Sequence, residues 1–581
     1  MSSEPEELVA AYKEGRLIEV AYELSCGSNE NRQSVSGLLV ELHNNGDIDL
    51  VDAFLDLRNN AENGPDFFIS RDLFENALPG IAAPVQGVMT CIQRLVNEAG
   101  NDLAANTVIG SFIDFLAADS SRPSQALDII QRSLDDWSNF VYPTILAGTR
   151  INLEEYFGHA VKLIGHEDPE ISRNAMYALG RISYPEGSRY LNLAMEQVER
   201  TVDQKSDDAY MAVVIKTASS IAIIDVALEE QTHSVISTAL EKGADLTLHA
   251  ASEEFASHTN KLPDKLLNIF ISHLPRVKPE NKGSIRKIDF GIRTLFKKDT
   301  NLAIECLENI LLSNPDTLSL KMFDSVTHEI LSMGLTTLNY LLTRWFIKGD
   351  RVLCTAMTEI LESVHGDQLK LEIDTMAMPN NMSTTFIFLA RKVIGYLFFR
   401  PVSASSIIIS ILRIAPDDDV MNELERLTLD PLLMNYPGSV RDFLESQISK
   451  EPEKVSAIIE SALKKLDEYL KRIRDIGEIP ELFPSLSQRE AYTRNFNQKM
   501  AVSYKQAMKG SIVEMIATKS VILYGRSSIN YVRQNSSISS RMEIPMQKHS
   551  VEMEFPRRHN LDPFGLEYML RVFQVERIVT K

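Results

Sequence analysis

The stretch DPEISRNAMYALGRI, from Asp168 to Ile182, decides the fold class of this chain. Asp168 can cap a helix that begins at Pro169, where the missing backbone N–H leaves no helical hydrogen bond unmade. Apolar residues then recur at steps of three and four along one helical face: Ile171, Ala175, Ala178, Leu179 and Ile182. Gly180 and the alanines are small, so the stretch predicts a helix that another helix approaches closely.

Helix starts of the same kind recur along the chain at regular distances. A capping-type residue precedes an apolar helical run at five further positions: Asp208, Asp245, Asn281, Asp316 and Asp350. The successive steps from Asp168 are 40, 37, 36, 35 and 34 residues. A period of this length suits two helices and two short turns, which is the unit of an α-solenoid. A large irregular helical domain with ordinary aspartate caps is the alternative.

The stretch at Asp168 resembles the second helix of a HEAT repeat. In that family an Asp-containing turn, often with Pro, leads into an apolar–Arg pair, then Ala, then Ala-Leu-Gly. This chain matches at Asp168, Pro169, Ile171, Ala175, Ala178, Leu179 and Gly180. It departs at Ser172, where the family often has Arg, with Arg173 one place later. The resemblance is specific over about residues 150–365 and implies a curved surface that binds proteins.

These patterns predict a mainly α chain: an α-solenoid of HEAT-like helix pairs followed by a small α+β C-terminal module. We expect irregular helical repeats over 1–150, the HEAT-like solenoid over 151–475, a linker over 476–486 with Pro480 and Pro484, and the module over 487–581. An amphipathic helix at 453–473 would close the solenoid. The apolar stretch 386–414 is interrupted by charges, including Arg391 and Lys392, which favours a buried helix pair over a membrane span.

The period changes near the end of the chain. Residues 520–525, 528–534, 541–546 and 550–555 alternate apolar and polar side chains or are β-rich, which predicts strands. Helices are expected at 487–519 and 562–573. The face formed by Val551, Met553 and Phe555 should then be buried against one of these helices, because an exposed apolar edge would aggregate.

Charge is distributed unevenly. Residues 485–581 hold 15 Lys+Arg and 8 Asp+Glu, a net of +7, in a chain whose total is −20. The basic end could bind a nucleic acid by phosphate pairing and stacking, or dock on its own acidic solenoid or another acidic protein. Its candidate anion-binding or polar cluster is Arg526, Arg533, Arg541, His549, Glu552, Glu554, Arg557, Arg558 and His559. Glu552 and Glu554 beside a histidine could also hold a divalent metal, or simply form the solvated face of an edge strand.

No common catalytic or nucleotide-binding motif is present: GxxxxGK[ST], GxGxxG after a strand, HExxH and GxSxG are all missing. The four cysteines lie apart in helical patterns, which favours a reduced, cytoplasmic setting. We therefore expect a protein–protein interaction scaffold that is not an enzyme and needs no cofactor or metal. The alternative is a nucleic-acid-binding or -processing component of a multi-protein system, such as a bacterial defence assembly.

Overall fold

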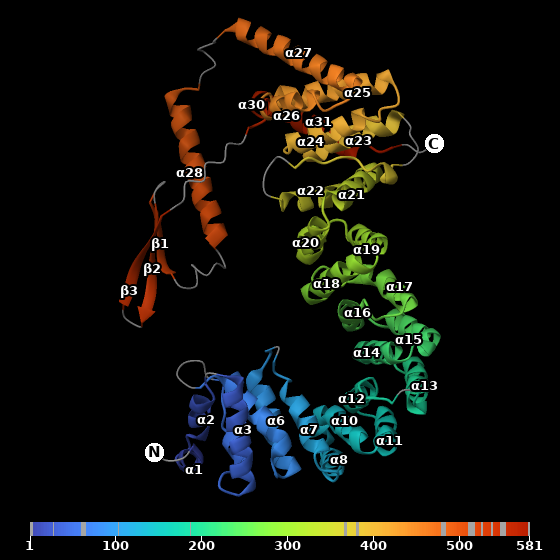
Figure 1. Ribbon diagram of the computed structural model, residues 1–581, viewed down its shortest axis with the longest axis vertical. Coiled ribbons are helices and arrows are strands. Elements are labelled where there is room, and N and C mark those ends of the chain that lie inside the picture. The colour runs from blue at the N-terminus through green and yellow to red at the C-terminus, as the bar shows by residue number, and fades with distance from the viewer. Residues whose placement is uncertain are drawn as a thin grey trace. The chain divides into compact units, whose positions relative to one another are not determined.

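The computed structural model describes residues 4–26, 28–59, 65–102, 104–185, 187–364, 369–378, 383–477, 484–508, 517–523, 527–535, 538–545 and 554–578. The chain forms two compact units, Met1–Ser332 and Met333–Lys581. Figure 1 shows both units, with helices making up most of each.

The first unit consists of helices joined by short turns. Before the regular repeats these are α1 Glu4–Lys13, α2 Leu17–Ser25, α3 Asn29–Asn44, α4 Leu50–Leu55, α5 Phe67–Ala77, η1 Leu78–Gly80, α6 Val85–Ala99, α7 Val108–Ala117, α8 Arg122–Arg132, α9 Leu134–Trp137 and η2 Ser138–Phe140. The repeats follow as α10 Val141–Ile151, α11 Leu153–Ile164, α12 Pro169–Leu179, α13 Arg189–Gln204, α14 Asp208–Ile224, η3 Val226–Leu228, α15 Glu229–Lys242, α16 Asp245–His258, α17 Asp264–His273, η4 Leu274–Arg276, α18 Lys282–Lys298, α19 Thr300–Ser313, η5 Leu320–Met322 and α20 Asp324–Ser332.

Two stacked rows of helices build the repeat region of this unit (Figure 1). In one row α10, α12, α14, α16, α18 and α20 each pack on the next; in the other, α13, α15 and α17 do so. The predicted close approach at Gly180 is present, because a Cβ added there would lie 2.7 Å from the Cα of Thr217 in α14. The chain therefore has a helical-repeat fold, as the period predicted.

Aspartates connect one repeat to the next. Asp168 caps α12 by accepting the backbone N–H groups of Glu170 and Ile171. Asp208, predicted as the cap of its own helix, instead accepts the N–H groups of Ala244, Leu246 and Thr247 at the start of α16. Its neighbour Asp207 caps α14. In the same way Asp289 accepts the N–H groups of Ser325 and Val326 at the start of α20. The unpaired backbone N–H groups at the starts of α16 and α20 thus donate to an aspartate of the preceding repeat.

The expected helix after Asp316 is displaced. Residues 314–319 form turns and extended chain, and α20 begins only at Asp324. Leu318 and Leu320 are both buried there although they are two residues apart. Two buried residues at this spacing suit extended chain better than a helix. The helix therefore starts at Asp324, eight residues after Asp316.

The second unit continues with helices and ends in mixed structure. Its helices are α21 Leu335–Lys348, α22 Arg351–Glu362, η6 Thr375–Ala377, α23 Ser383–Leu397, α24 Pro401–Leu412, α25 Asp418–Leu427, η7 Thr428–Leu433, α26 Ser439–Ile448, α27 Glu453–Ile476, α28 Leu486–Met508, α30 Arg557–Leu561 and α31 Pro563–Val575. The apolar stretch 386–414 forms the helix pair α23 and α24, and every residue of α24 is buried. Among the described residues, no helix is both long and apolar enough to cross a membrane.

Strands β1 Ala517–Leu523, β2 Ser527–Asn535 and β3 Ile538–Pro545 form an antiparallel sheet in the order β1-β2-β3. In its register Ser520 lies opposite Asn530, and Tyr531 opposite Arg541. The expected connection at 547–549, and residues 550–553 of the last expected strand, lie outside the described residues.

The structure does not support the expected α+β module. Helix α31, one of the two helices expected to cover the sheet, packs on α23 of the helical array. Phe555, expected in the core of the module, is 65% exposed. On α28, Tyr492 and Phe496 of the expected packing stripe are exposed as well. The reason is that α31 finds its apolar and polar partners among the helices that precede α28, which sequence periodicity does not reveal.

Candidate functional site

The described members of the predicted polar cluster belong to different elements of the chain. Arg526, His549 and Glu552 lie outside the described residues. Arg533 lies in β2 opposite Ser539, and Arg541 of β3 is exposed and forms an ion pair of 3.1 Å with Glu543. Arg557 and His559 are exposed on α30. Anion binding by this cluster and nucleic-acid binding by this segment therefore stay predictions.

The two remaining members, Glu554 and Arg558, hold the chain end on the helical array. Glu554 accepts hydrogen bonds from the N–H groups of Gly438 and Ser439, both 2.8 Å, and from the Ser439 hydroxyl at 2.7 Å. A carboxylate at the N-terminus of α26 is favoured by the helix dipole and satisfies otherwise unpaired donors. Arg558 forms an ion pair of 3.2 Å with Asp430, and its backbone N–H donates to Asn435 at 2.9 Å. Both residues serve structural docking.

A groove of about 530 Å³ in the first unit has a different character. We call it the amide groove; it is lined by Ile92, Gln93, Val96, Asn97, Asn106, Ile109, Gly110, Ile113, Asn139, Phe140, Tyr142, Asn174 and Tyr177. These residues come from α6, α7, η2, α10 and α12, except Asn106, which lies in the turn between α6 and α7. Their polar side chains are carboxamides and phenols, and no Asp, Glu, Lys or Arg is among them. The groove is polar without being charged.

Some side-chain amides of the groove are hydrogen-bonded within the chain, and others are available to a ligand. The side chain of Gln93 donates to the carbonyl of Asp136 at 3.1 Å, and that of Asn174 donates to the carbonyl of Ser138 at 3.1 Å. Asn97, Asn106 and Asn139 are exposed, and within the described part of the chain their side chains have no hydrogen-bond partner. Three carboxamides thus offer donors and acceptors to a ligand.

Two tyrosines form an aromatic wall beside the amides. The rings of Tyr142 and Tyr177 lie 5.0 Å apart between centroids and are tilted by 55°. The guanidinium of Arg181 lies 5.2 Å from the centroid of the Tyr177 ring, within the range of a cation–π contact. Burial, with a smaller contribution from Tyr177, raises the pKa of Tyr142, so this phenol keeps its proton and can donate a hydrogen bond at neutral pH.

Sequence reasoning missed this groove, although a signal for it exists. Asn139 and Asn174 are 35 residues apart, and so are Tyr142 and Tyr177, which matches the helix-pair period. Asn106 precedes Asn139 by 33 residues. Equivalent positions of successive repeats face the same surface. A search for polar residues in phase with the apolar repeat would have found them.

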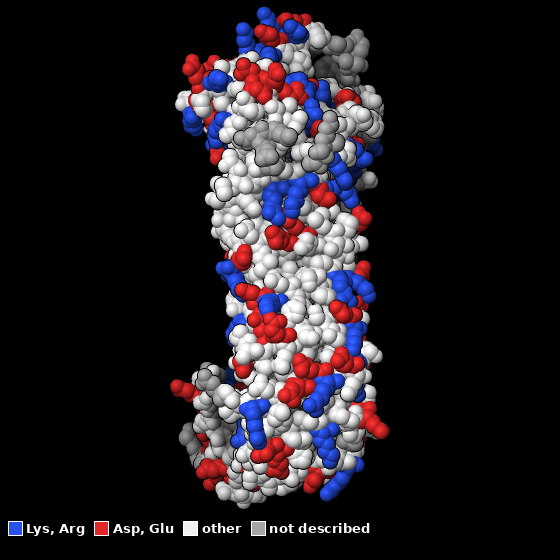
Figure 2. Space-filling view, turned by 90° about the vertical axis from the view of Figure 1, so that its right-hand side faces the viewer, with Lys and Arg blue, Asp and Glu red and all other residues white. Residues whose placement is uncertain are grey.

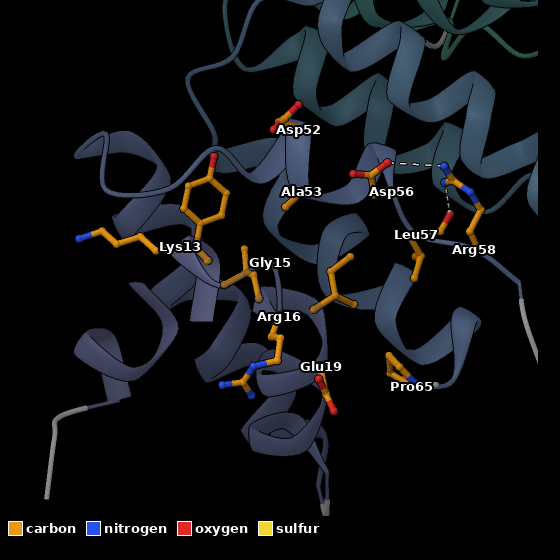
Figure 3. A pocket seen from close by; sticks show the side chains of 13 residues that line it. Lys13, Gly15, Arg16, Glu19, Asp52, Ala53, Asp56, Leu57, Arg58 and Pro65 are labelled. Atoms are coloured by element: carbon orange, nitrogen blue, oxygen red, sulfur yellow. Dashed lines mark hydrogen bonds and ion pairs between the residues drawn. The ribbon is translucent and has the colours of Figure 1, made fainter. Parts of the chain in front are cut away.

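A second hollow, of about 650 Å³, lies among the N-terminal helices and is drawn in Figure 3. Its charged side chains include Arg16, Glu19, Asp52, Asp56 and Arg58. They are largely engaged locally: Arg58 pairs with Asp56 at 3.5 Å, as Figure 3 shows, and Arg16 pairs with Glu14. This hollow has mixed charges from helix ends, whereas the amide groove combines uncharged polar groups from successive repeats.

The face drawn in Figure 2 shows side chains of both charge signs. On the face turned to the viewer in Figure 2, acidic and basic side chains are interspersed. Within the described ranges, no group of three or more His, Cys, Asp or Glu residues could hold a metal ion. Three of the cysteines, Cys91, Cys306 and Cys354, are buried, and burial raises the pKa of each thiol to about 12.

No known protein family matches this sequence, and no curated protein matches it. Among solved structures, an engineered protein is 14% identical over 80% of this chain and 99% of its own, with a TM-score of 0.19. A chain from a study of the interaction between cadherin and beta-catenin is 13% identical over 80% and 96%, with a TM-score of 0.23. A circular tandem repeat protein is 12% identical over 81% and 98%, with a TM-score of 0.17.

At these TM-scores the similarities carry no argument about this chain. The helical-repeat fold therefore rests on the chain's own packing of helix on helix. Membership of the HEAT family in particular stays a resemblance.

Proposed function

We propose that this chain is a protein-binding scaffold whose first unit holds an extended polypeptide segment in the amide groove. The observation that carries this proposal is the lining itself: three open carboxamides and two tyrosines on an uncharged surface.

A polypeptide backbone matches these amides chemically. Every peptide unit offers one N–H donor and one C=O acceptor, and a carboxamide side chain offers the complementary pair. Backbone groups removed from water need partners. Asn97 on α6, Asn106 in the turn after it and Asn139 on η2 supply them. A ligand in a helix would already satisfy its own backbone, so an extended segment fits this lining better.

The apolar part of the groove favours a ligand with spaced side chains. Ile92, Ile109, Ile113 and Phe140 lie among the amides, and the two tyrosine rings present flat faces. Aromatic side chains contribute large contact areas with little loss of conformational freedom. An apolar or aromatic side chain of the ligand would pack here while its backbone pairs with the amides.

The same lining disfavours the alternative ligand. Binding of a nucleic acid depends on neutralising phosphates with Lys and Arg, and the residues that line the groove include neither. A neutral, dipolar backbone needs no such charges. The proposed ligand is therefore a protein segment.

The test uses the full chain and a phage-displayed library of random 15-residue peptides. Peptides selected on the wild type should lose affinity roughly 10- to 100-fold for the variant N97A/N106A/N139A, since each hydrogen bond contributes about 1 kcal/mol. These amides have no partner within the described chain, so the variant should keep the wild-type melting temperature.

Asn309→Ala is the matched control. This asparagine is exposed on α19, away from the groove, and the substitution should leave peptide binding unchanged. Failure to select any peptide would overturn the proposal. So would peptides that bind the triple variant as tightly as the wild type.

A further inference from the structure

Helix α31 has two apolar faces, and only one of them is covered. Its inner face carries Leu566 and Leu570, which are buried where α31 packs on α23. Its outer face carries Phe564, Tyr568, Val572 and Val575, with exposed fractions of 83%, 73%, 42% and 71%. We call these four residues the outer face of α31. An exposed apolar face of this kind marks an interaction site.

The outer face is held in a fixed position. Asp562 begins the helix by accepting the N–H of Gly565 at 2.9 Å. Near its end the helix is attached to α23 through Gln574, whose side chain donates to the carbonyl of Gly395 at 2.7 Å. A partner that binds the outer face therefore meets a preformed ridge and loses less free energy to ordering.

The size of the face fits a modest protein interface. Each aromatic side chain buries about 150–250 Å², so Phe564 and Tyr568 together expose roughly 230–390 Å² at the fractions given above. The two valines and Leu561, which is 78% exposed just before the helix, extend the patch. A standard interface takes about 800 Å² from each partner, and the patch would form the apolar centre of one.

We propose that the outer face of α31 binds the outer face of α31 in a second copy of this chain, with the two helices antiparallel. A two-fold interface uses the same patch on both copies, so the patch must be self-complementary. Phe564 and Val572 lie four residues before and after Tyr568. A reversed copy therefore places the Phe564 ring opposite the smaller Val572 and leaves Tyr568 at the axis.

The charges beside the face select the same arrangement. Glu567 and Arg571 form an exposed ion pair of 2.7 Å along one side of α31. Their midpoint lies one residue from Tyr568, so an antiparallel neighbour presents its Arg571 to Glu567 and its Glu567 to Arg571. In a parallel two-fold pair the two Glu567–Arg571 flanks would lie on opposite sides and would not meet, so only the antiparallel arrangement gains this charge pairing.

Sedimentation velocity of the full chain across a range of concentrations tests the proposal. We expect a monomer–dimer equilibrium with a dissociation constant in roughly the micromolar range, as a small interface supports. Tyr568→Glu should raise that constant at least about 100-fold by placing two like charges at the axis. Because Tyr568 is exposed, the melting temperature of the variant should match that of the wild type at concentrations below the dimer dissociation constant.

Tyr492→Glu is the matched control, since Tyr492 is 74% exposed on α28. This variant should dimerise like the wild type. The proposal would be overturned if the chain stays monomeric at about 100 µM, a concentration well above the expected dissociation constant. A dimer that survives Tyr568→Glu, or one that Tyr492→Glu dissociates, would do the same.

Cysteine cross-linking tests the antiparallel register. In a Cys26→Ser background, which removes an exposed thiol, Phe564→Cys and Val572→Cys chains are oxidised separately and as a mixture. The mixture should yield a disulfide-linked dimer far more efficiently than either variant alone. Equal or better cross-linking of the single variants would show a parallel or different contact and overturn the antiparallel arrangement.

Discussion

The ammonium group of Lys392, wholly buried in α23, donates a hydrogen bond of 2.5 Å to the main-chain oxygen of Gln574, 182 residues further along the chain. Beside it, Arg391 pairs with Glu576 at 3.0 Å. Desolvation by burial lowers the pKa of Lys392, which reflects the free-energy cost of burying a charged ammonium; its hydrogen bond opposes that cost. This relationship attaches the C-terminal helix to the helical array.

Lys392→Met should loosen that attachment. The substitution keeps an apolar stem of similar length but leaves the Gln574 oxygen without its charged donor, a loss of about 1–3 kcal/mol. Backbone amides of residues 563–578 should then exchange with deuterium at least tenfold faster, while those of α14 keep the wild-type rate. Lys282→Met, at an exposed position of α18, is the control and should change neither region. Unaltered exchange over 563–578 in Lys392→Met would contradict the role given to Lys392.

Substitutions at the adjacent residues Glu554 and Phe555 should change the free energy of unfolding by different amounts. Phe555→Asp should change the free energy of unfolding by less than about 0.5 kcal/mol, because the Phe555 side chain is 65% exposed. Glu554→Ala should cost about 0.5–2 kcal/mol, because it removes the three hydrogen bonds that cap α26. Urea unfolding of both variants gives the comparison. A larger loss for Phe555→Asp would show that this ring is buried after all.

Two glycine-to-alanine substitutions distinguish the effect of close helix packing on stability from the effect of helix propensity. Gly180→Ala should destabilise the first unit by about 1–3 kcal/mol, since the new methyl group would lie 2.7 Å from the backbone of Thr217. Gly158→Ala in α11 should be neutral or stabilise by up to about 1 kcal/mol, because an added Cβ meets no atom within 4 Å there. Thermal unfolding followed by circular dichroism distinguishes the two. Equal effects would mean that α12 and α14 do not approach at Gly180.

The buried carboxyl group of Glu254 should make stability depend on pH. Desolvation raises the pKa of Glu254 from 4.5 to about 7, against the opposing charges of Arg181 and Lys216. One of its oxygens has no hydrogen-bond partner within the described chain, and His258 lies 3.7 Å away. The folded state binds this proton more tightly than the unfolded state, so stability is lost as pH rises from about 4.5 to 7. Above pH 7 the full cost of burying the charge remains.

Glu254→Gln should remove that dependence. At pH 8 the variant should be more stable than the wild type by about 1–3 kcal/mol, and at pH 4.5 the two should be nearly equal. Glu253→Gln is the control: desolvation raises the pKa of Glu253, but the hydrogen bond and charge of Lys216 outweigh it and the pKa is lowered. That variant should gain no stability at pH 8. A pH profile of Glu254→Gln parallel to the wild type would refute the assignment.

Much of the repeat fold could be predicted because its signals are local. The caps at Asp168 and Asp350 precede α12 and α22 as expected, and Gly180 lies where two helices meet. Asp208 shows where this reasoning fails. It marks the correct part of the chain, but its carboxylate serves the next repeat, 36 to 39 residues on. A capping residue identifies a helix start within a residue or so, and not which start it satisfies.

For the candidate sites too, the sequence showed some features and not others. The sequence shows the basic, polar C-terminal residues, and a common anion site for them stays a prediction. Glu554 binds the start of α26, 115 residues earlier, and Arg558 pairs with Asp430 inside η7, 128 residues earlier. The amide groove was overlooked because no single asparagine in it forms a motif; only their common phase with the repeat connects them.

The sequence by itself determined the helical character of this chain, the period of its repeats and the positions where helices pack closely. These properties depend on residues three or four apart, whose relation is set by the geometry of one helix. Only the tertiary structure decided that α31 returns to α23, that Lys392 meets Gln574, and that Asn106, Asn139 and Asn174 line one groove. Contacts between residues tens to nearly two hundred positions apart depend on how whole helices pack, and no local pattern encodes which distant partner a side chain will meet.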